Sequence, residues 1–367
     1  MAPEIVVEGS LLDDQGPRPG YARIRNGRLV ETGKLGTDST RGRVRRVRGI
    51  VLPSPVNGHT HLGDAVATRE PPLTPLSDIV RPPDGYKFRL LRDTPPANKR
   101  RAMRAALKLM ERQGVAATID FREEGVAGAQ LLRAASRRLR IRTVILGRPS
   151  LRPVDDRELT ELLDVADGVG LSSVAEETAA FRRRVASVCR ARGKRLALHA
   201  SESSREDPDD YLRPRPDLLV HLAMATREDL RRVARAGVTV AVCPRSNALF
   251  GRRPDLAEFD RLGVRTVLGT DNAMFHSPSI WRELEFAYVA GRLARRPVRP
   301  EFLFRAAFVE PYRWLGIPRA ARLDPEGPIR PIAFRLPADD PAYQIVARAT
   351  EHLMVRTGPS PIGPPLP

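Results

Sequence analysis

The chain has 367 residues, of which 41% are hydrophobic and 5% aromatic, and its formal net charge is +18. It is long enough for one large domain with a small appendage. No run of about 18 uncharged apolar residues occurs, so we expect no transmembrane helix. The N-terminus also lacks the pattern of a signal peptide. Two cysteines, Cys189 and Cys243, are too few for a disulfide framework, so we expect a cytoplasmic protein.

The positive charge is carried almost wholly by arginine, in runs such as 41–48, 137–142 and 182–184. Such runs invite an interpretation as a nucleic-acid surface. The arginines are, however, spread over the helical segments among acidic residues, and no aromatic-rich strand could stack bases. Nucleic-acid binding is therefore the less favoured interpretation. We expect a small-molecule substrate and no membrane contact, and a homo-oligomer is an open alternative to a monomer.

The first elements in chain order are short strands. Residues 3–8, 21–25 and 28–32 are β-like runs, and the turn residues Asn26-Gly27 separate the last two. These runs predict that residues 1–50 form the N-terminal part of a small β domain.

Residues 51–62, with the sequence VLPSPVNGHTHL, begin as an apolar run that predicts a buried strand. They end in His59-Thr60-His61. Side chains alternate in an extended segment, so His59 and His61 point the same way beyond the strand's end. Two such imidazoles are half of a site for a divalent cation such as zinc. Taken alone, the pair is equally consistent with two histidines in a surface loop.

Residues 63–96 follow as a proline-rich, irregular stretch. So long a loop in a compact domain is usually either disordered or functional. Since it comes directly after the two histidines, we expect it to be a lid over the site.

From residue 97 onward, helix-like segments alternate with short apolar strands. The predicted helices cover residues 97–113, 125–139, 156–166, 175–191, 226–236, with Thr226 as N-cap, 256–262 and 278–295. The predicted strands cover residues 51–62, 114–121, 141–146, 168–173, 195–199, 218–221, 237–242 and 265–269.

This alternation predicts parallel strands joined by right-handed crossovers. Eight units over about 250 residues are the size of a (β/α)8 barrel. The alternative, an open doubly wound sheet, usually carries a glycine-rich phosphate loop after its first strand. Here the first strand ends in two histidines instead. We therefore predict an α/β fold with a (β/α)8 barrel over residues 51–320.

The C-terminal part of the chain is predicted to return to the small β domain. One further helical stretch covers 301–316, and residues 328–336 and 342–347 look β-like again. We expect residues 321–367 to form the C-terminal part of that domain, followed by a proline-rich tail.

Several potential metal ligands fall at the ends of the predicted barrel strands. His59 and His61 end the first strand, His199 the fifth and His221 the sixth, and Asp271 follows the eighth. The active site of such a barrel is built at the C-terminal ends of its strands. If these residues were only structural, a ligand-type side chain would have to stand by chance at the ends of four different strands. The sequence therefore predicts a metal site on this rim.

Other polar residues on the rim are candidate participants. Glu202, three residues after His199, can reach a water at the metal without binding the metal, although it could also serve as a helix-start carboxylate. For the predicted substrate contacts, a solvated or loop-stabilising role is equally open. These are Arg122, Glu123, Arg148, Arg245, Ser246, Asn247 and His276.

The motifs HTH, HASE, VH, CPRSN and GTDN, in this order, resemble the amidohydrolase superfamily. The resemblance is strongest to the branch of chlorohydrolases and of cytosine-, guanine- and adenosine-type deaminases, and it covers nearly the whole chain. It implies that His221 hydrogen-bonds the attacking water or the substrate and that Glu202 shuttles a proton. It also implies one divalent metal held by His59, His61, His199 and Asp271. Asp271 is in addition expected to act in catalysis by accepting a hydrogen bond from the attacking water.

The resemblance also bears on the number and kind of metal ions. Dinuclear members often bridge two metals with a carboxylated lysine on the fourth strand. The corresponding residues here, 168–173, contain no lysine. A single ion is therefore expected, with zinc favoured and iron or manganese as alternatives. The C-terminal sheet departs from the superfamily's Ala-Asp-Leu step, and the chain is short for the branch, which leaves the substrate open.

The resemblance implies a hydrolase acting on carbon–nitrogen bonds other than peptide bonds. The H-x-x-E pattern of His199 and Glu202 is that of the deaminating members, so we predict an aminohydrolase of a nitrogen heterocycle. A cyclic amidase or a chlorohydrolase on the same site is the alternative. An alternative of another class is a non-catalytic basic binding protein on a barrel scaffold, which the intact ligand set argues against.

Overall fold

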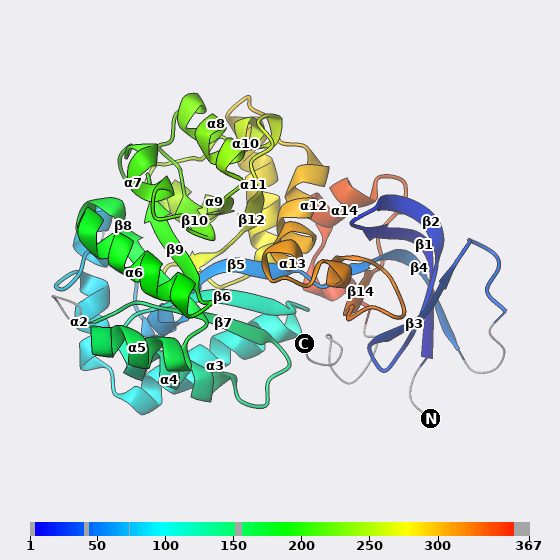
Figure 1. Cartoon of the computed structure of the whole chain (residues 1–367). Coiled ribbons are helices and arrows are strands. Elements are labelled where there is room, and N and C mark those ends of the chain that lie inside the picture. Colours follow the sequence, from blue (N-terminus) through cyan, green and yellow to red (C-terminus); the bar gives the residue numbers. More distant parts are fainter. Residues whose placement is uncertain (1–3, 40–43, 73, 151–155, 356–367) are drawn as a thin grey trace.

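The computed structural model describes residues 4–39, 44–72, 74–150 and 156–355, and the proline-rich tail lies outside these ranges. The described residues form a large sheet that curls into a barrel and a smaller sheet beside it (Figure 1). Within these ranges no helix is both long and apolar enough to cross a membrane.

The large sheet confirms the predicted barrel. All its pairings are parallel, and β5 to β12 follow one another in order around the ring. β12 pairs with β11, and the next strand, β13, pairs with β5, which closes the ring. The strands are β5 (Val56–His61), β6 (Ala117–Arg122), β7 (Arg142–Gly147), β8 (Gly168–Ser173), β9 (Arg195–Ala200), β10 (Leu218–His221), β11 (Thr239–Val242), β12 (Thr266–Leu268) and β13 (Asp271–Asn272).

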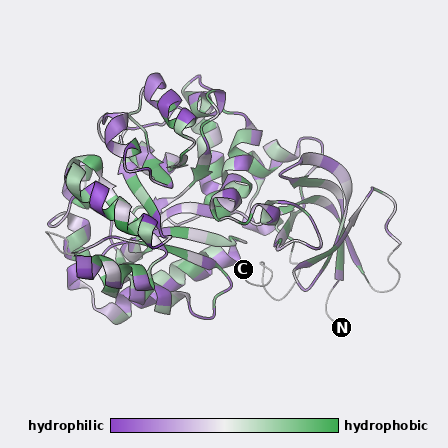
Figure 2. Ribbon diagram, viewed as in Figure 1, coloured by the Kyte–Doolittle hydropathy of each residue, from purple (hydrophilic) through white to green (hydrophobic). Residues whose placement is uncertain are grey.

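Helices surround this barrel. Their apolar faces share one continuous core with the strands, and Figure 2 shows hydrophilic and hydrophobic residues alternating along them. The predicted cap at Thr226 is present, because its side chain accepts from the Asp229 N–H while the Asp229 carboxylate accepts from the Thr226 N–H. The helices are α3 (Pro96–Arg112), α4 (Gly125–Ser136), α5 (Asp156–Val165), α6 (Ala179–Ala191), α7 (Pro208–Leu212), α8 (Arg227–Ala236), α9 (Pro244–Leu249), α10 (Leu256–Arg261), α11 (Ile280–Leu293), α12 (Pro300–Phe308) and α13 (Glu310–Trp314).

The small sheet joins the two ends of the chain, as predicted. Its strand order is β14-β4-β1-β2-β3, and it has a separate hydrophobic core. How the chain divides into independently folding domains stays a prediction. The strands are β1 (Glu4–Asp13), β2 (Gly16–Arg25), β3 (Arg28–Gly33), β4 (Arg45–Pro53) and β14 (Pro331–Phe334).

Three predicted elements are wrong. The single strand at 51–62 is two strands in different sheets, because prolines 53 and 55 interrupt the backbone donors between β4 and β5. The β-like run at 342–347 lies in helix α14 (Pro341–Arg348). Asp340 starts that helix by accepting from the Tyr343 N–H, and a proline occupies its first turn.

The third error concerns residues 63–96, which we call the cover. It is not irregular: it contains most of a 3-10 helix (Leu62–Val66), α1 (Leu76–Val80) and α2 (Tyr86–Asp93). These helices are short and interrupted by prolines, so they leave little periodic signal in the sequence.

Candidate metal centre and active site

The predicted ligands meet at the C-terminal rim of the barrel. His59 Nε2 lies 3.2 Å from Asp271 Oδ1, and His61 Nε2 lies 3.5 Å from the same oxygen. His61 Nε2 is also 3.4 Å from His199 Nε2. All four side chains are buried. The structure therefore brings together three imidazoles and one carboxylate from strands far apart in the sequence.

The hydrogen bonds behind two of these histidines determine which ring nitrogens carry protons. His61 Nδ1 is 2.8 Å from Glu123 Oε1, and His199 Nδ1 is 2.9 Å from the Leu171 carbonyl oxygen. Both partners accept, so both Nδ1 atoms carry the proton and both Nε2 atoms present lone pairs. Two lone pairs 3.4 Å apart cannot hydrogen-bond each other, whereas a cation between them would bind both. The donor set fits a divalent metal such as zinc.

The protonation states also fit a metal. Burial lowers the pKa of His61 to about 3 and that of His199 well below its ordinary value. Burial alone would raise the pKa of Asp271, but the hydrogen bond from His59 and the other nearby imidazoles outweigh it and hold that pKa well below its usual range. Neutral imidazoles and an ionised carboxylate are the forms that bind divalent cations.

Side chains behind the rim hold the strands in register. The Asn57 side-chain amide donates to Thr270 Oγ1 (2.8 Å), and its oxygen accepts from the Thr270 N–H (3.1 Å). A Cβ on Gly269 would lie 2.6 Å from the Cβ of His59, so only glycine permits this approach. These contacts link the first and last strands of the barrel, from which His59 and Asp271 come.

Two site residues have unusual backbone conformations. His221 has φ 75° and Asp271 has φ 60°, in the left-handed region that residues other than glycine seldom occupy. Such strain is concentrated at functional sites, where the surrounding structure maintains it. Here it directs two polar side chains to the end of the barrel.

Glu202 and His221 form a pair beside the ligands. His221 Nε2 is 3.4 Å from Glu202 Oε1, and the Asn247 amide donates to His221 Nδ1 at 3.2 Å. With Nδ1 as acceptor, Nε2 carries a proton that is directed at Glu202. Burial raises the pKa of Glu202, and its side chain remains 19% exposed. A carboxyl with a raised pKa and access to the cavity is suited to accepting and returning a proton.

Six of the seven predicted substrate contacts lie outside the lining of the central cavity, and three of them support the ligands. Glu123 accepts a hydrogen bond from His61, and Arg122 pairs with Glu123. The Ser246 hydroxyl donates to Asp271. Of the predicted contacts, only Arg148 lines the central cavity, and its contact with substrate stays a prediction. The others do not line it: Arg245 pairs with Glu283, Asn247 bonds His221, and both ring nitrogens of His276 are buried without a partner within the described chain.

The central cavity has a volume of about 50 Å³ and opens among His61, His199, Glu202 and Asp271. The cover forms part of its wall through Leu76, Val80 and Lys87. The cover thus lies against the site, and its role as a lid stays a prediction.

Lys87 is a site residue that the sequence did not reveal. Its Nζ pairs with Asp64 Oδ2 at 2.9 Å and with Glu123 Oε1 at 2.5 Å. It also lies 3.1 Å from His61 Nδ1, but this contact is not a hydrogen bond, because that nitrogen already carries a proton directed at Glu123. Burial alone would lower the pKa of Lys87, but the Asp64 and Glu123 carboxylates raise it above its ordinary value, so the ammonium is retained. The one available signal was a lysine in a chain whose cations are nearly all arginine.

Comparison with known proteins identifies the family. Residues 50–325 match the Amidohydrolase family. A protein of Methanothermobacter thermautotrophicus, provisionally named an aminohydrolase, is 37% identical over 281 residues, which cover 70% of this chain and 72% of the relative. The chain belongs to the amidohydrolase family. It is therefore a hydrolase, and the alternative of a non-catalytic binding protein is not supported.

Other relatives of this amidohydrolase agree. A provisionally named aminohydrolase of Archaeoglobus fulgidus is 32% identical and covers 68% of this chain and 72% of its own length. A zinc-containing adenosine deaminase of Xanthomonas campestris superposes with a TM-score of 0.78 at 18% identity, covering 99% of this chain and 94% of the other. The zinc complex of an atrazine chlorohydrolase of Arthrobacter aurescens superposes with a TM-score of 0.78 at 20% identity, covering 98% of this chain and 95% of the other. Both structures confirm the fold.

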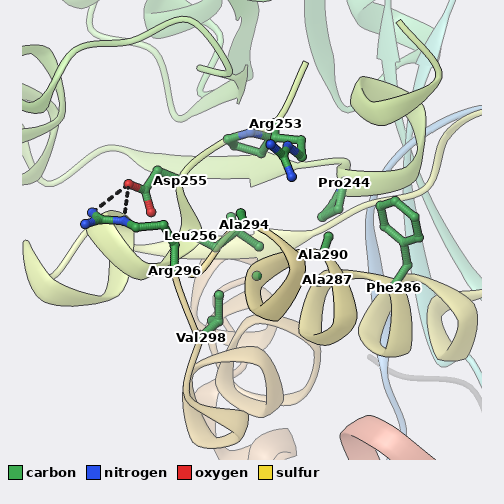
Figure 3. Close-up of a pocket in the computed structure, with 12 residues that line it drawn as sticks. Pro244, Arg253, Asp255, Leu256, Phe286, Ala287, Ala290, Ala294, Arg296 and Val298 are labelled. Carbon is green, nitrogen blue, oxygen red and sulfur yellow. Dashed lines mark hydrogen bonds and ion pairs between the residues drawn. The ribbon is translucent and has the colours of Figure 1, made fainter. Parts of the chain in front are cut away.

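A larger cavity of this amidohydrolase, of about 260 Å³, lies away from the rim against α11 (Figure 3). Its wall includes Ala287, Ala290 and Ala294, and an ion pair of 2.7 Å joins Asp255 and Arg296 at its edge. Its lining contains no histidine, cysteine or glutamate, and its one carboxylate, that of Asp255, is held by Arg296.

Proposed function

We propose that this amidohydrolase is an aminohydrolase that replaces an amino group on a nitrogen heterocycle by oxygen and releases ammonia. The observation that carries the proposal is the position of Glu202. Its carboxyl has a raised pKa and lies next to His221 and to a cluster of three histidines and one aspartate. Hydrolysis of an amidine-type carbon needs one group that takes a proton from water and returns it to nitrogen.

We assign one divalent metal ion, favouring zinc, to His59, His61, His199 and Asp271. The support is the donor set itself: opposed Nε2 lone pairs, neutral rings and an ionised carboxylate. A bound divalent cation supplies the Lewis acidity that makes water acidic enough to be a nucleophile near neutral pH. Glu123 orients His61, and Ser246 orients Asp271.

The residues of the chain divide the proton transfers between them. In the proposal, the Glu202 carboxylate accepts a proton from the attacking water and donates it to the ring nitrogen beside the reacting carbon. The hydrogen bond from Asn247 to His221 Nδ1 keeps the ring proton on Nε2. This N–H donates to the oxygen that develops negative charge. The second proton of the same water passes from the new hydroxyl group through Glu202 to the amino group, the exocyclic C–N bond breaks, and ammonia leaves while the oxygen stays on the ring carbon as a carbonyl.

The cover has a part in the proposal because the central cavity is small. A volume of about 50 Å³ holds water but not a heterocyclic ring. We propose that Leu76, Val80 and Lys87 move away to admit substrate and return to exclude bulk water.

Elemental analysis followed by an ammonia-release screen tests the proposal. About one divalent ion per chain is expected, since the described ligand set makes one site. Purines, pyrimidines, pterins and triazines with exocyclic amino groups should include a substrate. Two tightly held ions would contradict the single-metal assignment. Chloride release would indicate a chlorohydrolase, and ring opening without ammonia a cyclic amidase.

We also propose a cytoplasmic location for the enzyme. Both cysteines are free and buried, which suits a reducing cytoplasm. A small-molecule substrate is the expected partner, nucleic acid is not expected, and a homo-oligomer is left to measurement of the mass in solution.

A further inference from the structure

Four arginines in the described chain are nearly fully buried, and one of them differs from the rest. Arg122 pairs with Glu123, Arg182 with Asp210 and backbone carbonyls, and Arg330 donates to the Ala116 carbonyl oxygen. Arg148 is 7% exposed, yet within the described part of the chain its side chain has no hydrogen bond or ion pair, and its Nε is buried without a partner. A buried charge without a partner is costly, so such a group is seldom retained without a function.

Arg148 lies where a substrate would pass. It lines the central cavity together with His61, His199 and Glu202. It also lines a second cavity of about 680 Å³, beside α2 of the cover. Ser172 and Glu176 line both cavities as well, so the three residues mark the boundary between them.

The other charges near this boundary do not neutralise Arg148. Glu123 is engaged by Arg122 and Lys87, and Glu124 is paired with Lys99. Glu176 is exposed, so water screens its charge. The guanidinium therefore remains available to a ligand.

We infer that the substrate carries an acidic group, a carboxylate or a phosphate, which pairs with Arg148 while the ring lies at Glu202 and the metal ligands. This inference rests on the proposed function. A guanidinium offers a planar fork that binds either oxyanion through two parallel hydrogen bonds. The acidic group would extend from the ring toward the second cavity, which has room for the rest of the molecule.

Matched substrate pairs test the inference. The pairs are adenosine with adenosine 5′-monophosphate, for phosphate, and pterin with pterin-6-carboxylate, for carboxylate. The wild type should prefer the acidic member of at least one pair in kcat/KM. Arg148→Gln should reduce that preference by about 10- to 100-fold, mainly through KM, because one charge-assisted hydrogen-bonded contact is lost. The neutral member, which has no acidic group to pair with Arg148, should lose much less kcat/KM than the acidic member.

Two controls separate recognition from structure. Arg299→Gln removes the same charge from a surface position whose side chain is 72% exposed, and should leave the preference intact. In the absence of ligand, Arg148→Gln should be at least as heat-stable as the wild type, because it removes an unpaired buried charge. If Arg148 were needed for folding, Arg148→Gln would instead have a lower melting temperature than the wild type.

A binding measurement makes the result independent of turnover. Inorganic phosphate or succinate should raise the melting temperature of the zinc-loaded wild type more than that of Arg148→Gln. If both anions act equally on the two proteins, or if the variant loses acidic and neutral substrates alike, the inference is overturned. If neutral heterocycles release ammonia without any acid preference, the proposed function stands and the inference fails. If anions distinguish the two proteins but no heterocycle releases ammonia, the anion site stands and the proposed function fails.

Discussion

The barrel rim and the cover both contribute side chains to the central cavity, but they position them differently. His59, His199 and Asp271 lie on strands whose backbones are hydrogen-bonded to their neighbours. Lys87 lies on α2, a helix of eight residues, and is held by the Asp64 and Glu123 carboxylates. The rim residues are thus positioned by the sheet, whereas the cover residue depends on side-chain contacts that can separate. We therefore expect changes at the rim to abolish function and changes in the cover to weaken it.

The largest effect should follow His199→Ala. The variant removes a lone pair that faces His61 Nε2 at 3.4 Å, so the purified protein should lose both its metal and its activity. Metal content per chain is the measurement. His352→Ala, at an exposed histidine far along the chain, is the matched control and should keep both. A His199→Ala protein that retains a full metal complement would show that this rim residue is not a ligand.

The next largest effect should follow Glu202→Gln. The amide keeps the size of the side chain but cannot accept a proton, so turnover should fall by about 10²–10⁴-fold. Metal content and melting temperature should stay near the wild-type values, unlike those of His199→Ala. Glu285→Gln, on the exposed face of α11, is the control. Wild-type turnover by a metal-loaded Glu202→Gln protein would refute the assigned proton transfer.

A smaller effect is expected from the cover variant Lys87→Met. It leaves the buried carboxylates of Asp64 and Glu123 without their ammonium, and Glu123 holds His61. Loss of such a supporting contact typically weakens metal affinity or activity by about 10- to 100-fold. Competition with a chelator measures the affinity for zinc.

Lys99→Met provides the matched control for Lys87→Met. Lys99 is also buried, and it binds Glu124 and the Leu91 carbonyl oxygen of α2, but it contacts no proposed ligand. The Lys99→Met variant should loosen the cover without changing the affinity for zinc. Equal zinc affinities in the two variants would mean that the cover does not act on the metal centre.

The smallest effect is on the cover alone. Limited proteolysis should cut within residues 63–96 before it cuts the barrel, because the helices described there have only five to eight residues and are interrupted by prolines. A bound substrate or inhibitor should slow the cutting. Cleavage at the same rate with and without ligand would indicate that the cover is a fixed wall rather than a lid.

Residues Val56–His61 and His199 show why the rim could be predicted. Strand side chains alternate with a period of two, and parallel strands end on one rim, so a histidine at a strand's end has a foreseeable position. The partners behind the rim were not foreseeable. Arg122, Glu123, Ser246 and Asn247 are polar residues just beyond strand ends, and their sequence positions do not show whether they face the cavity or the ligands.

The sequence by itself determined the alternation of strands and helices, the closure of eight units into a barrel, and the chemistry of the residues at the strand ends. These features depend on local periodicity and on residue type. Only the tertiary structure decided that Lys87 reaches His61 across 26 positions of the chain, and that Arg148 is buried without a partner among the described residues. Both facts depend on which side chains from distant segments share the same low-dielectric space. That is a property of the packing, and no sequence period encodes it.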